Sequence, residues 1–270
     1  MIDRSLPPEN QIPHDVCDTW VATDALGRAL PGWEECGPPR TGRFVGIFYF
    51  ICNNYDGPEA PADVTRIIAS NPTNPPFRPH FSHYWGEPEI GYYRSTDRWV
   101  IRRHAYQLAD AGVDTLIFDV TNNHIYPQTV AAVCETFRQV RAEGEKTPDV
   151  CFLASQKSVY QLWDHIYSKG LYSDLWFHWK DKPLLLFGHH AELHGDMNKI
   201  EFPEHIRQFF TIRKSWAWDS LAWYGEAEQS SVKGYHRWPW VAHYPQCVGW
   251  DIRRPPRSPI AEQVPVAVGQ

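Results

Sequence analysis

The chain has 270 residues, 43% of them hydrophobic, and its formal net charge of −6 comes from interspersed acidic and basic residues. This length allows one large α/β domain or two small ones. The absence of any Lys/Arg run argues against a nucleic-acid partner, and no apolar stretch is long enough to span a membrane. The 13 Trp, 13 Tyr and 13 Phe favour exposed stacking surfaces, for which sugar rings are a common partner, although a large fold also buries such residues.

Residues 1–43 are rich in Pro, Gly and charge, and we interpret them as an extended arm that precedes a domain at 44–270. No signal peptide is visible, so either the protein is cytoplasmic or the sequence begins after a cleavage point. None of the six Cys forms a C-x-x-C pair, which argues against a zinc or dithiol motif. Cys17 and Cys36 could pair, whereas Cys134 and Cys151 are predicted to be buried as small hydrophobic residues.

The first strong strand is predicted at 44–51, and a long irregular region follows at about 52–95. A loop of this length inside a compact domain is usually functional or disordered, and its aromatic residues argue against disorder. We therefore expect an active-site loop that carries the residues His83, Trp85, Glu87, Glu89, Tyr92 and Tyr93. The alternative for Glu87 and Glu89 is an exposed position or a salt bridge.

Strands and helices then alternate. Helices are predicted at 97–111, from Pro127 to Gly144, and at 159–170; strands are predicted at 115–118, 150–154 and 183–187. The strands recur about every 35 residues, the length of a βα unit, which predicts parallel strands with right-handed crossovers. Past residue 190 the pattern weakens. The segment 206–213 fits a helix end or a strand, 235–250 is predicted to be an aromatic loop, and 264–268 could begin another strand.

Polar residues follow each predicted strand. They are Asn53, Asn54 and Asp56; then Asp119, Asn122 and His124; then Gln156 and Lys157; then His189 and His190; then Lys214 and Trp216. The carboxyl ends of parallel strands share one rim, which is where α/β folds place their active sites. Asp119 is the most informative of these residues, because a carboxylate at the end of a buried strand is costly unless it is paired or used. The alternative is that Asp119 only caps a loop or accepts hydrogen bonds from neighbouring amides.

Three chemistries fit this rim. Glycoside hydrolysis needs two carboxyl groups, which Asp119 together with Glu87 or Glu89 would supply. A metal-dependent hydrolase would instead use histidines, drawn with Asp119 from the set His83, His124, His178, His189 and His190, but no H-E-x-x-H motif occurs. A serine nucleophile has the least support, because no G-x-S-x-G occurs.

Five segments together resemble uncharacterised bacterial relatives of glycoside hydrolase families 71 and 99, including the WbsX-like group. They are W-V-A-T-D-A-L-G-R (20–28), R-F-V-G-I-F-Y-F (43–50), H-Y-W-G-E-P-E-I-G-Y-Y (83–93), D-R-W-V-I-R-R-H-A-Y-Q-L-A-D-A-G-V-D (97–114) and F-D-V-T-N (118–122). The resemblance implies a (β/α)8 barrel of the TIM type and a carbohydrate-active enzyme, commonly exported.

The chain departs from this group in two ways. The group carries a late W-N-E-W or E-W-x-E-G type segment with the expected catalytic carboxylates, and the nearest segment here, W-Y-G-E-A-E (223–228), does not match it. We also count only about five to six βα units. The chain is therefore interpreted as the amino-terminal portion of a longer enzyme or as a shortened relative that binds sugar without cleaving it.

The predicted function is a glycoside-hydrolase-like protein that acts on an oligosaccharide or polysaccharide, with no cofactor and no metal. Asp119 and Glu87 are the predicted catalytic residues. The predicted substrate-binding residues are His83, Trp85, Tyr92, Asn122, His124, Lys157, Trp216 and Trp218. A non-catalytic carbohydrate-binding protein is the main alternative, and a metal-dependent hydrolase is the other.

Overall fold

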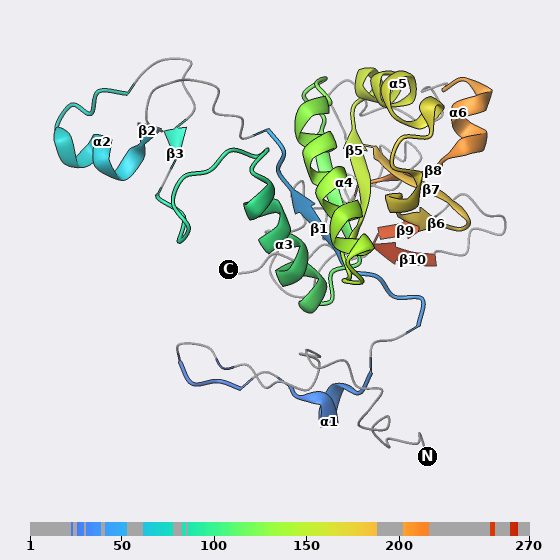
Figure 1. The fold of residues 1–270 in the computed structure, drawn as a ribbon, viewed down its shortest axis with the longest axis horizontal. Coiled ribbons are helices and arrows are strands. Elements are labelled where there is room, and N and C mark those ends of the chain that lie inside the picture. Colours follow the sequence, from blue (N-terminus) through green and yellow to red (C-terminus); the bar gives the residue numbers. More distant parts are fainter. Residues whose placement is uncertain are drawn as a thin grey trace, which may run out of the picture.

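The computed structural model describes residues 23, 26–29, 31–38, 41–52, 62–77, 83–84, 86–187, 202–215, 249–251 and 260–263. These residues form a mixed α/β structure in which helices are layered against a mostly parallel sheet (Figure 1). Among them, no helix is long and apolar enough to cross a membrane.

Among the described residues, five parallel strands form the main sheet. They are β1 (Gly46–Tyr49), β4 (Thr115–Val120), β5 (Asp149–Ala154), β7 (Lys182–Phe187) and β8 (Thr211–Lys214). They lie side by side in chain order, and the short strand β6 (His178–Trp179) is antiparallel to β7. The parallel arrangement predicted from the 35-residue period is thus confirmed for these strands.

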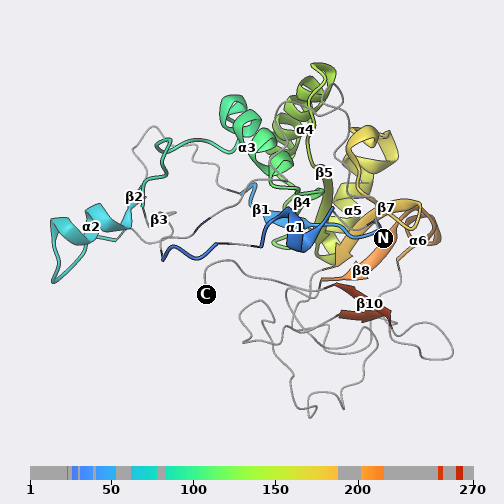
Figure 2. The same cartoon turned by 90° about the horizontal axis from the view of Figure 1, so that it is seen from below.

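The connections between these strands are helical. They contain α3 (Arg98–Asp110), α4 (Pro127–Ala142), α5 (Gln156–His165) with the 3-10 turns η3 (Tyr167–Lys169) and η4 (Ser173–Leu175), and α6 (Glu204–Phe209). One hydrophobic cluster joins residues of all four helices to alternate residues of β4, β5 and β7. Figure 2 shows α3 and α4 on one side of the sheet and β10 on the other. Because parallel neighbours in chain order need crossovers of one hand, their helices cover one face.

The alternation of side chains along β4 places Asp119 on the face of the sheet opposite the helices. Leu116, Phe118 and Val120 are fully buried in the cluster under the helices. Ile117 and Asp119 are half-buried and point to the opposite face. The prediction that the strand stops before Asp119 was wrong, because the ladder with β5 continues to Val120 paired with Ala154. Asp119 is therefore held by the sheet itself.

The start of α3 is fixed by Asp97, whose side chain accepts hydrogen bonds from the backbone nitrogens of Trp99 (2.9 Å) and Val100 (3.2 Å). We expect Asp97→Ala to lower the free energy of unfolding by about 1 kcal/mol, the usual loss for a helix cap. Thr96→Ala is the matched control and should change it by less than about 0.5 kcal/mol. Urea denaturation monitored by circular dichroism measures both values, and equal losses would contradict the assignment.

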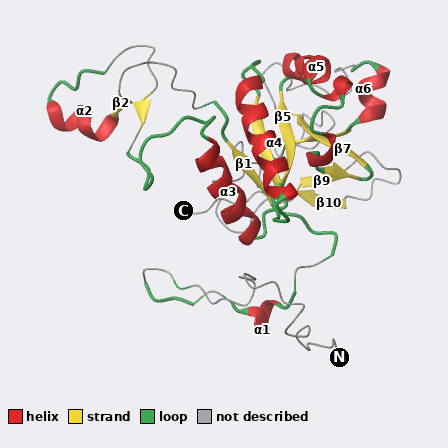
Figure 3. Cartoon of the chain, viewed as in Figure 1, coloured by secondary structure: helices red, strands yellow, loops and turns green. Residues whose placement is uncertain are grey.

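The predicted irregular region at 52–95 contains regular structure, so that prediction was wrong in part. It includes β2 (Ala62–Asp63), α2 (Val64–Ser70) and β3 (His83–Tyr84), and β2 pairs with β3 in parallel. The helix forms because Asp63 caps it, accepting a hydrogen bond from the Arg66 nitrogen at 2.9 Å. We call these three elements, with the described residues between them and the residues 86–93 that follow, the excursion. Figure 3 shows it set apart from the main sheet.

The described helix and strands of the two terminal segments lie outside the main sheet. Within 1–43, the described residues include the short helix α1 (Trp33–Cys36), and Cys36 is a free thiol rather than half of a disulfide. Cys134 and Cys151 are buried free cysteines, as predicted. Near the other end, β9 (Gly249–Asp251) and β10 (Ile260–Gln263) form an antiparallel pair, whereas the predicted strand at 264–268 lies outside the described residues.

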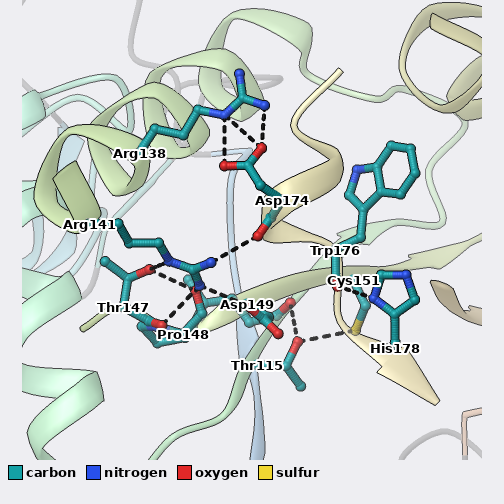
Figure 4. A network of polar contacts seen from close by, with 11 residues as sticks. Thr115, Arg138, Arg141, Thr147, Pro148, Asp149, Cys151, Asp174, Trp176 and His178 are labelled. Atoms are coloured by element: carbon teal, nitrogen blue, oxygen red, sulfur yellow. Dashed lines mark hydrogen bonds and ion pairs between the residues drawn. The ribbon is translucent and has the colours of Figure 1, made fainter. Parts of the chain in front are cut away.

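A polar network closes the amino ends of β4 and β5 (Figure 4). The Arg141 guanidinium donates five hydrogen bonds of 2.7–3.1 Å to oxygens of Thr147, Pro148, Asp149 and Asp174. It thereby ties the end of α4 to the start of β5 and to η4. Burial raises the pKa of Asp149, and the hydrogen bond and charge of Arg141 oppose that rise. In a parallel α/β fold this end of the sheet serves stability.

Candidate functional site at the carboxyl ends of the strands

Asp119 lies near the carboxyl end of β4, and one of its two carboxylate oxygens is held locally. Oδ1 accepts hydrogen bonds from the backbone nitrogen of Thr121 at 2.9 Å and from its hydroxyl at 2.8 Å. Among the described residues, no hydrogen bond to the other oxygen, Oδ2, is found. On the adjacent strand, the partner of Asp119 in register is Leu153, which is fully buried. The carboxylate is thus oriented through Oδ1 alone by the residues that the structure describes.

The loop from Thr121 to Tyr126 carries three polar or aromatic side chains beside Asp119. Asn122 donates through Nδ2 to the Tyr126 hydroxyl and accepts through Oδ1 from the His124 nitrogen at 3.3 Å. The His124 and Tyr126 rings meet edge to face, with centroids 4.5 Å apart. We name Asn122, His124 and Tyr126 the rim platform. Its Asn122 and His124 side chains are exposed, and its Tyr126 side chain is partly buried against the hydrophobic cluster.

Two neighbouring strands bring further groups to this rim. Cys52 follows β1, and partial burial raises the pKa of its thiol, with the negative charge of Asp119 adding to the effect. On the other side of β4, Ser155 caps α5 and the exposed Lys157 lies in its first turn. The carboxyl ends of β1, β4 and β5 therefore lie at the same edge of the sheet, as their parallel pairing requires.

The structure places the loop residues predicted for the site in the excursion. Glu87 forms an ion pair with Arg66 of α2 (2.7 Å), and both side chains are exposed, at 47% and 73%. Tyr92 donates its hydroxyl to Asp63 at 2.5 Å. Burial, together with this hydrogen bond, raises the pKa of Tyr92 to about 12. His83 lies on β3 with its ring 5.3 Å from that of Phe77. Glu89 pairs with Arg103 of α3 at 3.1 Å.

The structure thus separates the predicted site residues into those at the rim of the sheet and those in the excursion, and others lie outside the described residues. Asp119, Asn122, His124 and Lys157 lie at the rim of the sheet, and His83, Glu87 and Tyr92 lie in the excursion. In Figures 1 and 2 the part of the excursion that carries α2 and β3 lies well to one side of the strands. Trp85, Trp216, Trp218, His189 and His190 lie outside the described residues.

No three His, Cys, Asp or Glu side chains are grouped closely enough to hold a metal ion within the part of the chain that the structure describes. His178, one of the histidines considered for a metal site, lies on β6, and its Nδ1 is 2.7 Å from the backbone oxygen of Trp176. It belongs to the end of the sheet that the Arg141 network closes, as Figure 4 shows.

Sequence reasoning missed several residues of the rim. Tyr126 directly precedes α4, and its backbone is left-handed (φ 46°), which is uncommon for a bulky side chain. Asn123 is also left-handed (φ 65°), and Thr121 orients Asp119. The T-N-N-H run offered a signal, because Asn adopts left-handed backbone more readily than other non-glycine residues.

The fold and the rim define an α/β protein with a parallel sheet and a polar, aromatic surface at the carboxyl ends of its strands. No protein-family model matches the chain, and no curated protein sequence matches it. Among solved structures, the chain is similar to that of a GH99 endo-α-mannosidase from Bacteroides thetaiotaomicron in complex with bis-tris propane. The identity is 17%, the match covers 54% of this chain and 41% of the enzyme, and the TM-score is 0.36.

A second structure of the same enzyme matches at 18% identity over 55% of this chain and 46% of the enzyme, with a TM-score of 0.34. The chain therefore spans less than half the length of the enzyme that it matches. Overlap of this extent assigns neither a fold nor an activity, so the function has to be argued from the residues of the chain itself.

Proposed function

We propose that this chain binds an oligosaccharide or polysaccharide at the carboxyl ends of β1, β4 and β5, and that Asp119 acts on the glycosidic bond. The observation that carries the proposal is the geometry of Asp119. Its Oδ1 is held by Thr121, while Oδ2 has no hydrogen bond among the described residues. A carboxylate fixed in this way can orient a sugar hydroxyl or exchange a proton with the leaving or attacking oxygen.

The rim platform supports a sugar ligand. Sugar hydroxyls both donate and accept hydrogen bonds, and Asn122 and His124 offer both kinds of group. Tyr126 adds an amphipathic ring, which suits a ligand with apolar faces and polar edges. The motif resemblance to glycoside hydrolase families 71 and 99 points to the same class of ligand, independently of this geometry.

Glu87 is the proposed second carboxylate. Its exposed ion pair with Arg66 is of the kind that contributes less than about 1 kcal/mol, so a substrate contact can replace it. Two-carboxylate glycoside hydrolysis needs separations of at most about 9.5 Å. In the structure the excursion lies to one side of the strands (Figure 1), so this role requires the excursion to move until Glu87 lies over the rim.

The proposed architecture is a TIM-type (β/α) barrel formed by 44–270, preceded by an arm at 1–43. Five parallel strands in chain order, with helices on one face, support it, because a doubly wound sheet would reverse its strand order and cover both faces. Export and an eight-fold closure stay expectations from the resemblance.

A non-catalytic carbohydrate-binding protein is the second candidate. Two observations favour it: the late Glu-containing segment of the resembling group has no counterpart here, and Glu87 is paired with Arg66. For a metal-dependent hydrolase, the described residues offer no favourable observation.

The first experiment is a panel of mannan, glucan, xylan and galactan oligosaccharides, measured by titration calorimetry and by release of new reducing ends. We expect saturable binding of at least one member, with hydrolysis. Asn122→Ala and His124→Ala should each weaken binding about fivefold, the loss of one hydrogen bond. Asn74→Ala, an exposed change in the excursion, is the control and should have no effect.

Binding without reducing ends would support the non-catalytic candidate instead. If no member of the panel binds, or if Asn74→Ala weakens binding as much as Asn122→Ala, the rim is not the glycan site.

A further inference from the structure

A network of side chains, in which two serines are buried and Asn123 is exposed, links the loop after β4 to the start of α5. The Ser155 hydroxyl donates to Asn123 Oδ1 at 2.6 Å and accepts from the backbone nitrogen of Ser158 at 3.2 Å. The Ser158 hydroxyl, 3.1 Å from that of Ser155, donates to the carbonyl oxygen of Val120. Both serines are buried, at 4% and 0% exposure. The network therefore spans two adjacent strands immediately beside Asp119.

The loop that this network holds has an unusual backbone. Asn123 and Tyr126 are both left-handed, with φ of 65° and 46°. Residues in such conformations persist only where their surroundings determine them. Two anchors do so here: Asn123 is bonded to Ser155, and Ile125, at 5% exposure, is packed into the hydrophobic cluster. Between and beside these anchors, the Asn122 and His124 side chains are exposed, whereas Tyr126 is partly buried against the same cluster.

We infer that Asn123 and Ser155 are positioning residues for the glycan site: their hydrogen bond fixes the loop in the conformation that presents Asn122 and His124 beside Asp119. This inference rests on the proposed function. Asn123 directs its side-chain oxygen to Ser155, so it acts on the ligand through its neighbours. A loop ordered before binding loses less conformational entropy when the ligand arrives, and this raises affinity.

The test uses the full chain and the same oligosaccharide panel. Asn123→Gly keeps the left-handed backbone but removes the acceptor, whereas Asn123→Asp keeps an acceptor. We expect Asn123→Gly to weaken binding about fivefold and Asn123→Asp to stay within about twofold of the wild-type protein. In a double-mutant cycle with Ser155→Ala, the second change should add little, because either change alone breaks the bond. Hydrogen exchange at residues 121–126 without sugar should be faster in Asn123→Gly.

The outcomes separate the two claims. If the wild-type protein binds a sugar and Asn123→Gly binds it equally well, the positioning role is overturned and the proposed function stands. The same follows if Asn123→Asp loses as much affinity as Asn123→Gly, or if the Ser155→Ala and Asn123→Gly effects simply add. If the wild-type protein binds no member of the panel, the proposed function fails and this inference falls with it. Circular dichroism checks that each variant is folded. If Asn123→Gly is not folded, Ser155→Ala alone keeps the test decisive.

Discussion

Asp119→Asn is expected to bind the same oligosaccharides as the wild-type protein but to release reducing ends about 10²–10⁴-fold more slowly, the usual contribution of a general acid or base. The amide keeps the size of the carboxylate, and its carbonyl oxygen can still accept from the Thr121 nitrogen and hydroxyl. The loop therefore keeps its shape. What is lost is the ability of the group to gain or release a proton and to carry a negative charge.

Asp164→Asn is the matched control, because Asp164 is an exposed carboxylate on α5. It should leave both binding and turnover unchanged. Single-turnover kinetics with a saturating oligosaccharide separate the chemical step from binding. If Asp119→Asn retains wild-type turnover, Asp119 has no catalytic role. If instead it lowers affinity and leaves the chemical step unchanged, Asp119 is a binding residue.

Arg141→Ala is expected to lower the free energy of unfolding by about 2–4 kcal/mol. The change removes five hydrogen bonds and leaves the partly buried Asp149 carboxylate without its cation. Hydrogen bonds to charged groups contribute more than neutral ones, and a broken buried pair leaves an uncompensated charge. This loss of unfolding free energy is below that for a fully buried pair, because the Arg141 and Asp149 side chains are 29% and 36% exposed.

Arg138→Ala is the control. Arg138 also binds Asp174, but these side chains are 43% and 53% exposed, so its loss should amount to less than about 1 kcal/mol. Urea denaturation followed by circular dichroism gives both values. Equal losses for the two variants would show that the Arg141 network does not stabilise the end of the sheet.

The effect of Arg141→Ala should depend on pH. Burial gives Asp149 a pKa above its ordinary value, so the folded chain holds this proton more tightly than the unfolded chain. The contribution of the carboxyl group to stability is therefore greatest at acid pH. It declines as the pH rises through the interval between the pKa of Asp149 in the unfolded chain and its higher pKa in the folded chain. Arg141 opposes the rise in pKa, and its removal widens the interval. The loss in stability should thus be larger at about pH 7 than at about pH 4, near the ordinary pKa of Asp.

Local sequence predicted the regular elements well where one signal was strong. The apolar run at 115–118 and the period of about 35 residues predicted the parallel sheet, which the pairing of β4 with β1 and β5 confirms. Pro127 begins α4 as expected, since proline fits the first turn of a helix. The short helix α2 was missed, because seven residues flanked by Pro-rich segments give little periodicity.

By itself the sequence therefore determined the strands β1, β4, β5 and β7, their parallel order and a carboxylate near the end of a buried strand, because these follow from the spacing of apolar residues along the chain. Only the tertiary structure decided which groups meet. It paired Glu87 with Arg66, joined Asn123 to Ser155 and turned Tyr126 into a left-handed backbone beside Asp119. Asn123 and Ser155 are 32 positions apart, and their contact exists because β4 and β5 are neighbours. No local pattern encodes such a contact, since it depends on how two loops pack at the end of a sheet.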